Sequence, residues 1–134
     1  VMPQDEGAAV AAGGNGSSGP IPSVAYAPET VADFRAEGRP VFVNFTAAWC
    51  ITCLVNERVA LRSDAIAQAF ADANVAYVKG DWTNRDPVIT QALREFGRSG
   101  VPLYVLYPPE DDRKPIVLPQ ILTEDTVLQA LSSL

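Results

Sequence analysis

Histidine is absent from the 134-residue chain, and cysteine occurs only twice. The chain therefore lacks the side chain most used for acid–base catalysis and for zinc binding. Basic residues are scarce as well: 10 Lys and Arg against 16 Asp and Glu give a net charge of -6. This balance argues against a nucleic acid partner, because phosphate binding needs clustered cations. No apolar run approaches the roughly 18 residues of a membrane-spanning helix, so we expect neither a membrane span nor a secretory signal.

Residues 1–20 differ in composition from the rest of the chain. They contain five Gly, four Ala and two Ser, with no aromatic or basic residue. Such a segment cannot bury enough apolar surface to offset the entropy lost on ordering. We therefore expect a disordered, flexible linker at 1–20, or a non-native tail, followed by one folded domain over 21–134.

Beyond residue 20, helical and strand patterns alternate along the chain. The patterns predict helices at 29–37, 50–61, 63–73, 86–97 and from 123 onward, and strands at 41–45, 75–79, 103–107 and 115–118. Strands separated by helices favour parallel pairing, whereas the last two strands, joined by a short loop, favour an antiparallel hairpin. The expected fold class is α/β, with a central mixed β-sheet flanked by helices.

The strongest functional motif is Trp-Cys-Ile-Thr-Cys at 49–53, directly after the first predicted strand. Two cysteines three residues apart on a first helical turn can close a small disulfide ring. The free N–H groups and the dipole of the helix would stabilise a thiolate on the first cysteine. We therefore expect Cys50 to be the nucleophile and Cys53 the resolving thiol in thiol–disulfide exchange. Ile51 and Thr52 carry no charge, so we expect a reducing rather than a strongly oxidising couple, which a measured potential would test.

Other uses of Cys50 and Cys53 are possible from the sequence. Half of a zinc site would need further ligands from a second subunit or from carboxylates. A purely structural disulfide would close so short a loop that it would stabilise little. A Cu(I)-binding module would suit two soft thiolates, and a redox-inert adaptor would need neither cysteine.

A second motif, Gly-Val-Pro-Leu at 100–103, places a proline at the start of a buried strand. Proline is disfavoured there unless its position has a reason. A cis bond before Pro102 would present the Val101 backbone to an extended partner segment beside the cysteines. An ordinary trans proline at the start of a strand fits the sequence equally well.

Four separated blocks, at 41–53, 56–57, 80–86 and 96–104, resemble in order the C-terminal periplasmic domain of DsbD-type thiol:disulfide interchange proteins. These proteins are a branch of the thioredoxin superfamily. The resemblance covers residues 25–134 and implies a thioredoxin-like fold with a cis proline at Pro102. It also supports Cys50 as the nucleophile and Cys53 as the resolving thiol.

The resemblance further implies a protein-disulfide reductase in the bacterial periplasm. A transmembrane redox domain would reduce this domain, which would pass electrons to an N-terminal partner domain and then to clients such as isomerases and cytochrome c maturation proteins. Residues 1–20 would then be a tether, and the chain an excised piece of a longer protein. The alternative is a stand-alone thioredoxin-like reductant for cytochrome c or copper-protein maturation. We expect a monomer that needs no cofactor or metal.

Three further residues receive roles from the resemblance. Glu57 stands where the family has an acid near the active site, and its carboxylate could raise a thiol pKa and relay a proton; an exposed helix carboxylate is the alternative. Asn44 replaces a buried Asp of many thioredoxins and cannot act as a base. Trp49 is expected to form a substrate-docking surface with Val101 and Pro102, with plain core packing as the alternative.

Overall fold

The computed structural model describes residues 21–110 and 112–134. The segment 1–20, for which the sequence predicts a linker, lies outside the described residues. The described residues form a five-stranded sheet in the order β1-β3-β2-β4-β5. The strands are β1 (Val24–Ala25), β2 (Val41–Thr46), β3 (Ala76–Asp81), β4 (Leu103–Tyr107) and β5 (Ile116–Val117). Strands β1, β3 and β2 are parallel, whereas β4 runs antiparallel to both β2 and β5.

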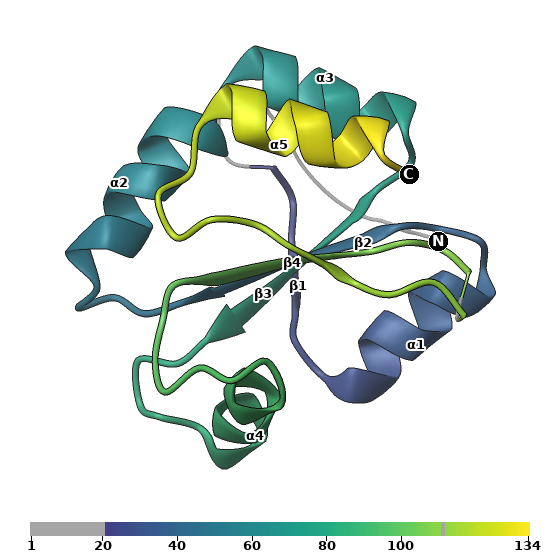
Figure 1. The fold of residues 1–134 in the computed structure, drawn as a ribbon. Helices are drawn as coiled ribbons and strands as arrows, with labels where there is room; N and C mark the ends of the chain where they lie inside the picture. Colours follow the sequence, from purple (N-terminus) through teal and green to yellow (C-terminus); the bar gives the residue numbers. More distant parts are fainter. Residues whose placement is uncertain (1–20, 111) are drawn as a thin grey trace.

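Five helices cover the sheet within the described part of the chain: α1 (Pro28–Ala36), α2 (Ile51–Ala60), α3 (Asp64–Asp72), α4 (Pro87–Glu95) and α5 (Glu124–Ser132). Helices α2, α3 and α5 lie on one face of the sheet and α1 and α4 on the other (Figure 1). The predicted α/β class with a mixed sheet flanked by helices is confirmed. Strand β1 was not predicted, because two exposed residues give no alternating pattern. None of these helices combines the length and the apolar character that a membrane crossing requires.

Side-chain caps explain why several helices begin where they do. The Ser63 hydroxyl accepts the Ile66 N–H at 3.2 Å and begins α3. Asp86 accepts the Val88 N–H at 2.8 Å and begins α4, with a proline at the first helical position. Each cap satisfies a backbone donor that the helix itself leaves free.

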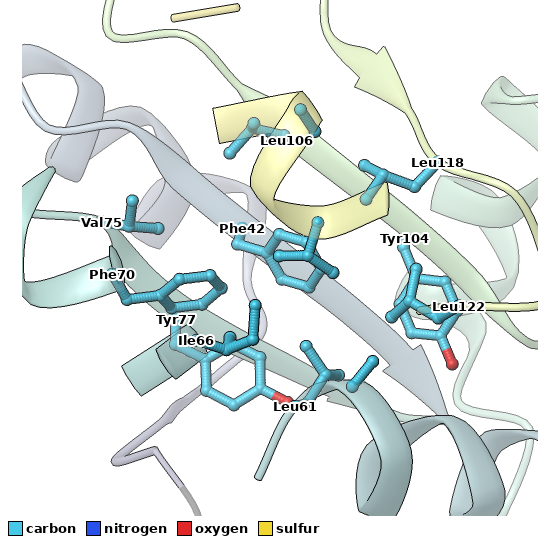
Figure 2. Close-up of a cluster of buried hydrophobic side chains, with 13 residues drawn as sticks. Phe42, Leu61, Ile66, Phe70, Val75, Tyr77, Tyr104, Leu106, Leu118 and Leu122 are labelled. Atoms are coloured by element: carbon cyan, nitrogen blue, oxygen red, sulfur yellow. The ribbon is translucent and has the colours of Figure 1, made fainter. Parts of the chain in front are cut away.

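The first core lies between the sheet and helices α2, α3 and α5. Phe42 is at its centre, with ring centroids 5.3 Å from Phe70 and 6.3 Å from Tyr104 (Figure 2). Tyr77 and Leu106 from the neighbouring strands join the same cluster. Strand β2 is buried at every residue, as expected for a central strand with helices on both faces.

The second core lies under α1 and α4. Val43 and Val105 of the sheet pack there with Val31 of α1 and Leu93 of α4. These two cores fix β2 rigidly along its length. The carboxyl end of β2 leads directly into residues 47–50, so the helices and the sheet hold the cysteine motif at a defined place.

Candidate active site

Cys50 and Cys53 form a disulfide at the start of α2, with their Cα atoms 5.3 Å apart. Cys50 is the N-cap residue, and its sulfur accepts the Cys53 N–H at 3.1 Å. Cys50 is 8% exposed, whereas Cys53 is completely buried. Of the two cysteines, only Cys50 therefore has surface that an attacking group can reach. The helix dipole and the Cys53 N–H would both favour negative charge on that sulfur after reduction.

Val101, which precedes Pro102, lies at the buried cluster that contains both cysteines. The Val101–Pro102 peptide bond is cis, and Pro102 is buried. Val101 is partly exposed and packs against the cluster formed by Ala47, Cys50 and Cys53. A polypeptide that approaches Cys50 would therefore meet Val101 as well.

Trp49 is a surface residue rather than part of a core, because 49% of it is exposed. Its indole N–H donates to the Thr83 carbonyl oxygen at 3.0 Å. Its ring centroid lies 5.9 Å from that of the buried Trp82, and the Arg85 guanidinium lies 5.2 Å from the Trp49 ring and 5.1 Å from the Trp82 ring. These contacts hold Trp49 beside Cys50 with one side open to solvent.

The loop that follows β3 is tied to the cysteine motif by hydrogen bonds. The Ala48 N–H donates to the Thr83 hydroxyl oxygen at 2.8 Å. The same hydroxyl and the Thr83 N–H both donate to the Asp81 carboxylate. These bonds, the hydroxyl bond first, hold the pKa of Asp81 below its ordinary value. Asp81 and Thr83 belong to the block at 80–86 that carries the family resemblance, but neither residue received a role from the sequence.

Glu57 lies one turn of α2 beyond Cys53, which places both side chains on the same helix face. Its carboxylate accepts the Thr46 hydroxyl at 2.9 Å and lies 3.3 Å from the Lys79 ammonium. Only 13% of the Glu57 side chain is exposed, so the alternative of a free helix carboxylate is wrong. Glu57 and Lys79 line an open hollow of about 230 Å³ together with Thr46, Ala47, Ala48, Leu54, Asp81 and Thr83.

A family model described as thioredoxin-like matches residues 23–109. The chain belongs to the thioredoxin-like family. Its fold and its Cys50–Cys53 pair identify it broadly as a thiol–disulfide oxidoreductase.

Individual relatives agree with this assignment. The thiol:disulfide interchange protein DsbD of Ralstonia nicotianae is 27% identical over 111 residues, which are 83% of this chain and 18% of that protein. The thioredoxin-like domain thus spans less than a fifth of this relative. The reduced C-terminal domain of Neisseria meningitidis DsbD matches with a TM-score of 0.62 and 21% identity, covering 76% of this chain and 87% of that one. A thioredoxin from Thermus thermophilus matches with a TM-score of 0.66 and 18% identity, covering 83% of this chain and 85% of that one. The predicted resemblance to a DsbD-type thioredoxin-like domain is confirmed.

Asn44 stands at the position where the resemblance led us to expect a buried Asp. The completely buried Asn44 donates from Nδ2 to the Tyr77 hydroxyl at 2.9 Å and to the Glu57 carboxylate at 3.5 Å. Its Oδ1 is buried without a partner among the described residues. Burial raises the pKa of Tyr77, so this phenol stays neutral. The carboxylate that contacts Asn44 is that of Glu57.

Lys79 was missed in the sequence analysis although it contacts Glu57. Its register partner on β2 is Asn44, so strand alternation could have placed both on the face that α2 covers. The described residues contain no group of three or more Cys, Asp or Glu side chains that could hold a metal ion. The expectation that no metal is needed stays a prediction.

Proposed function

We propose that this domain is a protein-disulfide reductase that relays electrons from a membrane-embedded redox domain to disulfides of other polypeptides in the periplasm. The observation that carries the proposal is the pair of sulfurs at the start of α2, of which only Cys50 has exposed surface. A relay needs one sulfur that a partner can reach and a second that is kept from solvent until it resolves the intermediate.

The chemistry balances within the two cysteines and the partner disulfide. The Cys50 thiolate attacks one partner sulfur, which forms a mixed disulfide and releases the other partner sulfur as a thiolate. The Cys53 thiolate then attacks the Cys50 sulfur and releases the first partner sulfur. The partner gains two electrons, and the domain returns to the Cys50–Cys53 disulfide seen in the structure. A dithiol of the upstream domain reverses these steps and reduces the pair again.

Glu57 is proposed to accept the Cys53 proton before the second attack. Cys53 is completely buried, so its proton must leave through a neighbouring group. Thr46 and Lys79 hold the Glu57 carboxylate in place. Replacing Glu57 with Gln should slow resolution of the mixed disulfide about a hundredfold while the first attack by Cys50 changes little. Rapid-quench measurement of the two steps would separate them, and an equal loss in both would contradict this role.

The surface around Cys50 supports a polypeptide partner. Apolar side chains are exposed on the first turns of α2 and just before it, namely Trp49, Ile51, Leu54 and Val55. Exposed apolar groups that gather at a reactive site are typical of a surface that binds another protein. The similarity to DsbD favours a transmembrane domain as the electron donor and a periplasmic domain as the acceptor. Cytochrome c maturation proteins are among the acceptors we propose.

Trapping the mixed disulfide would test the proposal. A Cys53→Ala variant should retain the partner covalently through Cys50, because the second attack cannot occur. The complex should be released by dithiothreitol, and mass spectrometry would identify the partner. The matched control is Cys50→Ser with Cys53→Ala, which keeps the surface but removes the nucleophile. Partner retention that is equal in both variants and insensitive to dithiothreitol would reject the exchange mechanism in favour of an adaptor.

A further inference from the structure

Three arginines gather at a hollow of about 270 Å³ beside the active site. We call it the arginine hollow, and it is lined by Trp82, Arg85, Thr90, Leu93, Arg94, Arg98 and Ser99. Its lining contains three cations and no acidic side chain, in a chain whose net charge is -6. Like charges that converge in this way repel one another, so a bound anion would stabilise the arrangement.

The arginines have no acidic partners within 21–110 and 112–134. Neither ion pair found in these residues involves Arg85, Arg94 or Arg98. Nη1 of Arg98 is buried and makes no hydrogen bond there, and an unsatisfied charged donor of this kind is costly. Arg94 is in the last turn of α4, where the helix dipole favours a cation. The dipole does not satisfy Nη1 of Arg98, which needs an acceptor.

The arginine hollow lies close to the disulfide, because two of its lining residues adjoin the cysteine motif or Val101. Trp82 forms one wall and packs against Trp49, the residue before Cys50. Ser99 forms another wall, two residues before Val101, which packs against the buried cluster that contains both cysteines. A polypeptide whose disulfide has reached Cys50 would therefore have its neighbouring residues close to the arginines.

We propose that the arginine hollow binds a carboxylate side chain of the partner polypeptide while the partner's disulfide reacts with Cys50. This inference rests on the proposed function and adds a preference for partners with Asp or Glu near the reactive disulfide. A guanidinium can bind both oxygens of a carboxylate. The volume of about 270 Å³ is just below the roughly 300 Å³ at which clefts begin to hold drug-sized ligands, so it suits one side chain. Binding of the carboxylate through Nη1 of Arg98, which has almost no accessible surface in this structure, requires the Arg98 side chain to turn towards the hollow.

The test uses disulfide-bridged peptides in matched pairs. Each pair carries Glu or Gln at one position, two to six residues from the disulfide, and the readout is the Glu-to-Gln ratio of kcat/KM. The reduced wild-type domain should prefer at least one Glu peptide roughly tenfold. Arg98→Gln should bring that ratio below about twofold, with Arg94→Gln as a second, exposed variant if Arg98→Gln does not fold. Arg58→Gln removes the same charge from the exposed surface of α2 and should keep the ratio.

Each alternative outcome is distinct. If the wild-type domain reduces Glu and Gln peptides at equal rates, the carboxylate site is wrong while the proposed function stands. If it reduces no peptide, both are wrong. Inorganic phosphate is the probe for a free anion. Thermal stabilisation by phosphate that is lost in Arg98→Gln, without any peptide preference, would assign the arginine hollow to a small oxyanion and overturn the proposal.

Discussion

Two buried asparagines on the same side of the sheet differ in how completely the chain satisfies them. Asn44 and Asn56 each donate from Nδ2 to a buried tyrosine hydroxyl at 2.9 Å, on Tyr77 and Tyr104 respectively. Asn56 also donates to the Gln120 carbonyl oxygen at 2.7 Å, and its Oδ1 accepts the Leu122 N–H at 3.1 Å. Oδ1 of Asn44 has no partner among the described residues, and its second donor contact is the 3.5 Å approach to Glu57.

This difference suits a structural role for the Asn56 amide and a role in the active site for the Asn44 amide. Asn56 joins α2 to the segment that precedes α5, and every bond it makes is internal to the fold. Asn44 contacts Glu57, the proposed proton acceptor, and leaves one acceptor unused beside it. We therefore expect the stability of the fold to depend more on Asn56, and the environment of Glu57 to depend more on Asn44.

The largest expected effect is on stability. Asn56→Ala would leave the Leu122 N–H, the Gln120 carbonyl and the Tyr104 hydroxyl without partners, which should cost about 3–4 kcal/mol. Asn44→Ala loses one good hydrogen bond and one long contact and should cost about 1–2 kcal/mol. Urea denaturation of the oxidised domain would measure both. If both variants lose the same unfolding free energy, the number of hydrogen bonds that each asparagine makes does not determine its contribution to stability.

The second prediction tests whether a charge at residue 44 interacts with the Glu57 carboxylate. Asn44→Asp would place a second carboxylate close to Glu57, and like-charge repulsion should raise the pKa of one of the two carboxyls above its unfolded value. A raised carboxyl pKa favours folding at low pH, and this contribution is lost as the pH rises through the folded-state pKa. The variant should therefore lose about 2 kcal/mol more stability at pH 8 than at pH 4, relative to wild type.

Two controls limit the interpretation of Asn44→Asp. Adding Glu57→Gln removes the repulsion and should remove the extra pH dependence. Asn56→Asp places a new carboxylate in the other buried amide position, where its partners are Tyr104 and the Gln120–Leu122 segment rather than Glu57. If Glu57→Gln leaves the pH dependence unchanged, burial of the new carboxylate alone explains it.

The cysteine site was predictable because its parts are close in sequence. Strand β2, the turn after it and the first turn of α2 occupy residues 41–53, and apolar patterning with two cysteines three residues apart indicates all of them. The contacts of Glu57 with Lys79 join residues 22 apart, and those of Asn56 with Leu122 join residues 66 apart. Such contacts depend on strand order and register, which a pattern along one chain does not specify. The arginine hollow was missed for the same reason, since Arg85 and Arg98 belong to different loops.

The smallest effect concerns the tyrosine partners of the two asparagines at high pH. Burial raises the pKa of Tyr104 to about 12, although the Asn56 hydrogen bond lowers it in part. An unfolded tyrosine ionises near pH 10, so between about pH 10 and 12 the folded state holds a proton that the unfolded state loses. Stability from this group is therefore full below pH 10 and declines as the pH rises towards 12.

Tyr104→Phe should reduce the loss of unfolding free energy between pH 9 and pH 11 by about 1 kcal/mol, measured by urea denaturation. Tyr77→Phe removes the hydroxyl that bonds to Asn44 and should also reduce this loss of stability, because burial raises the pKa of Tyr77 as well. An unchanged slope in both variants would show that neither buried phenol governs alkaline unfolding.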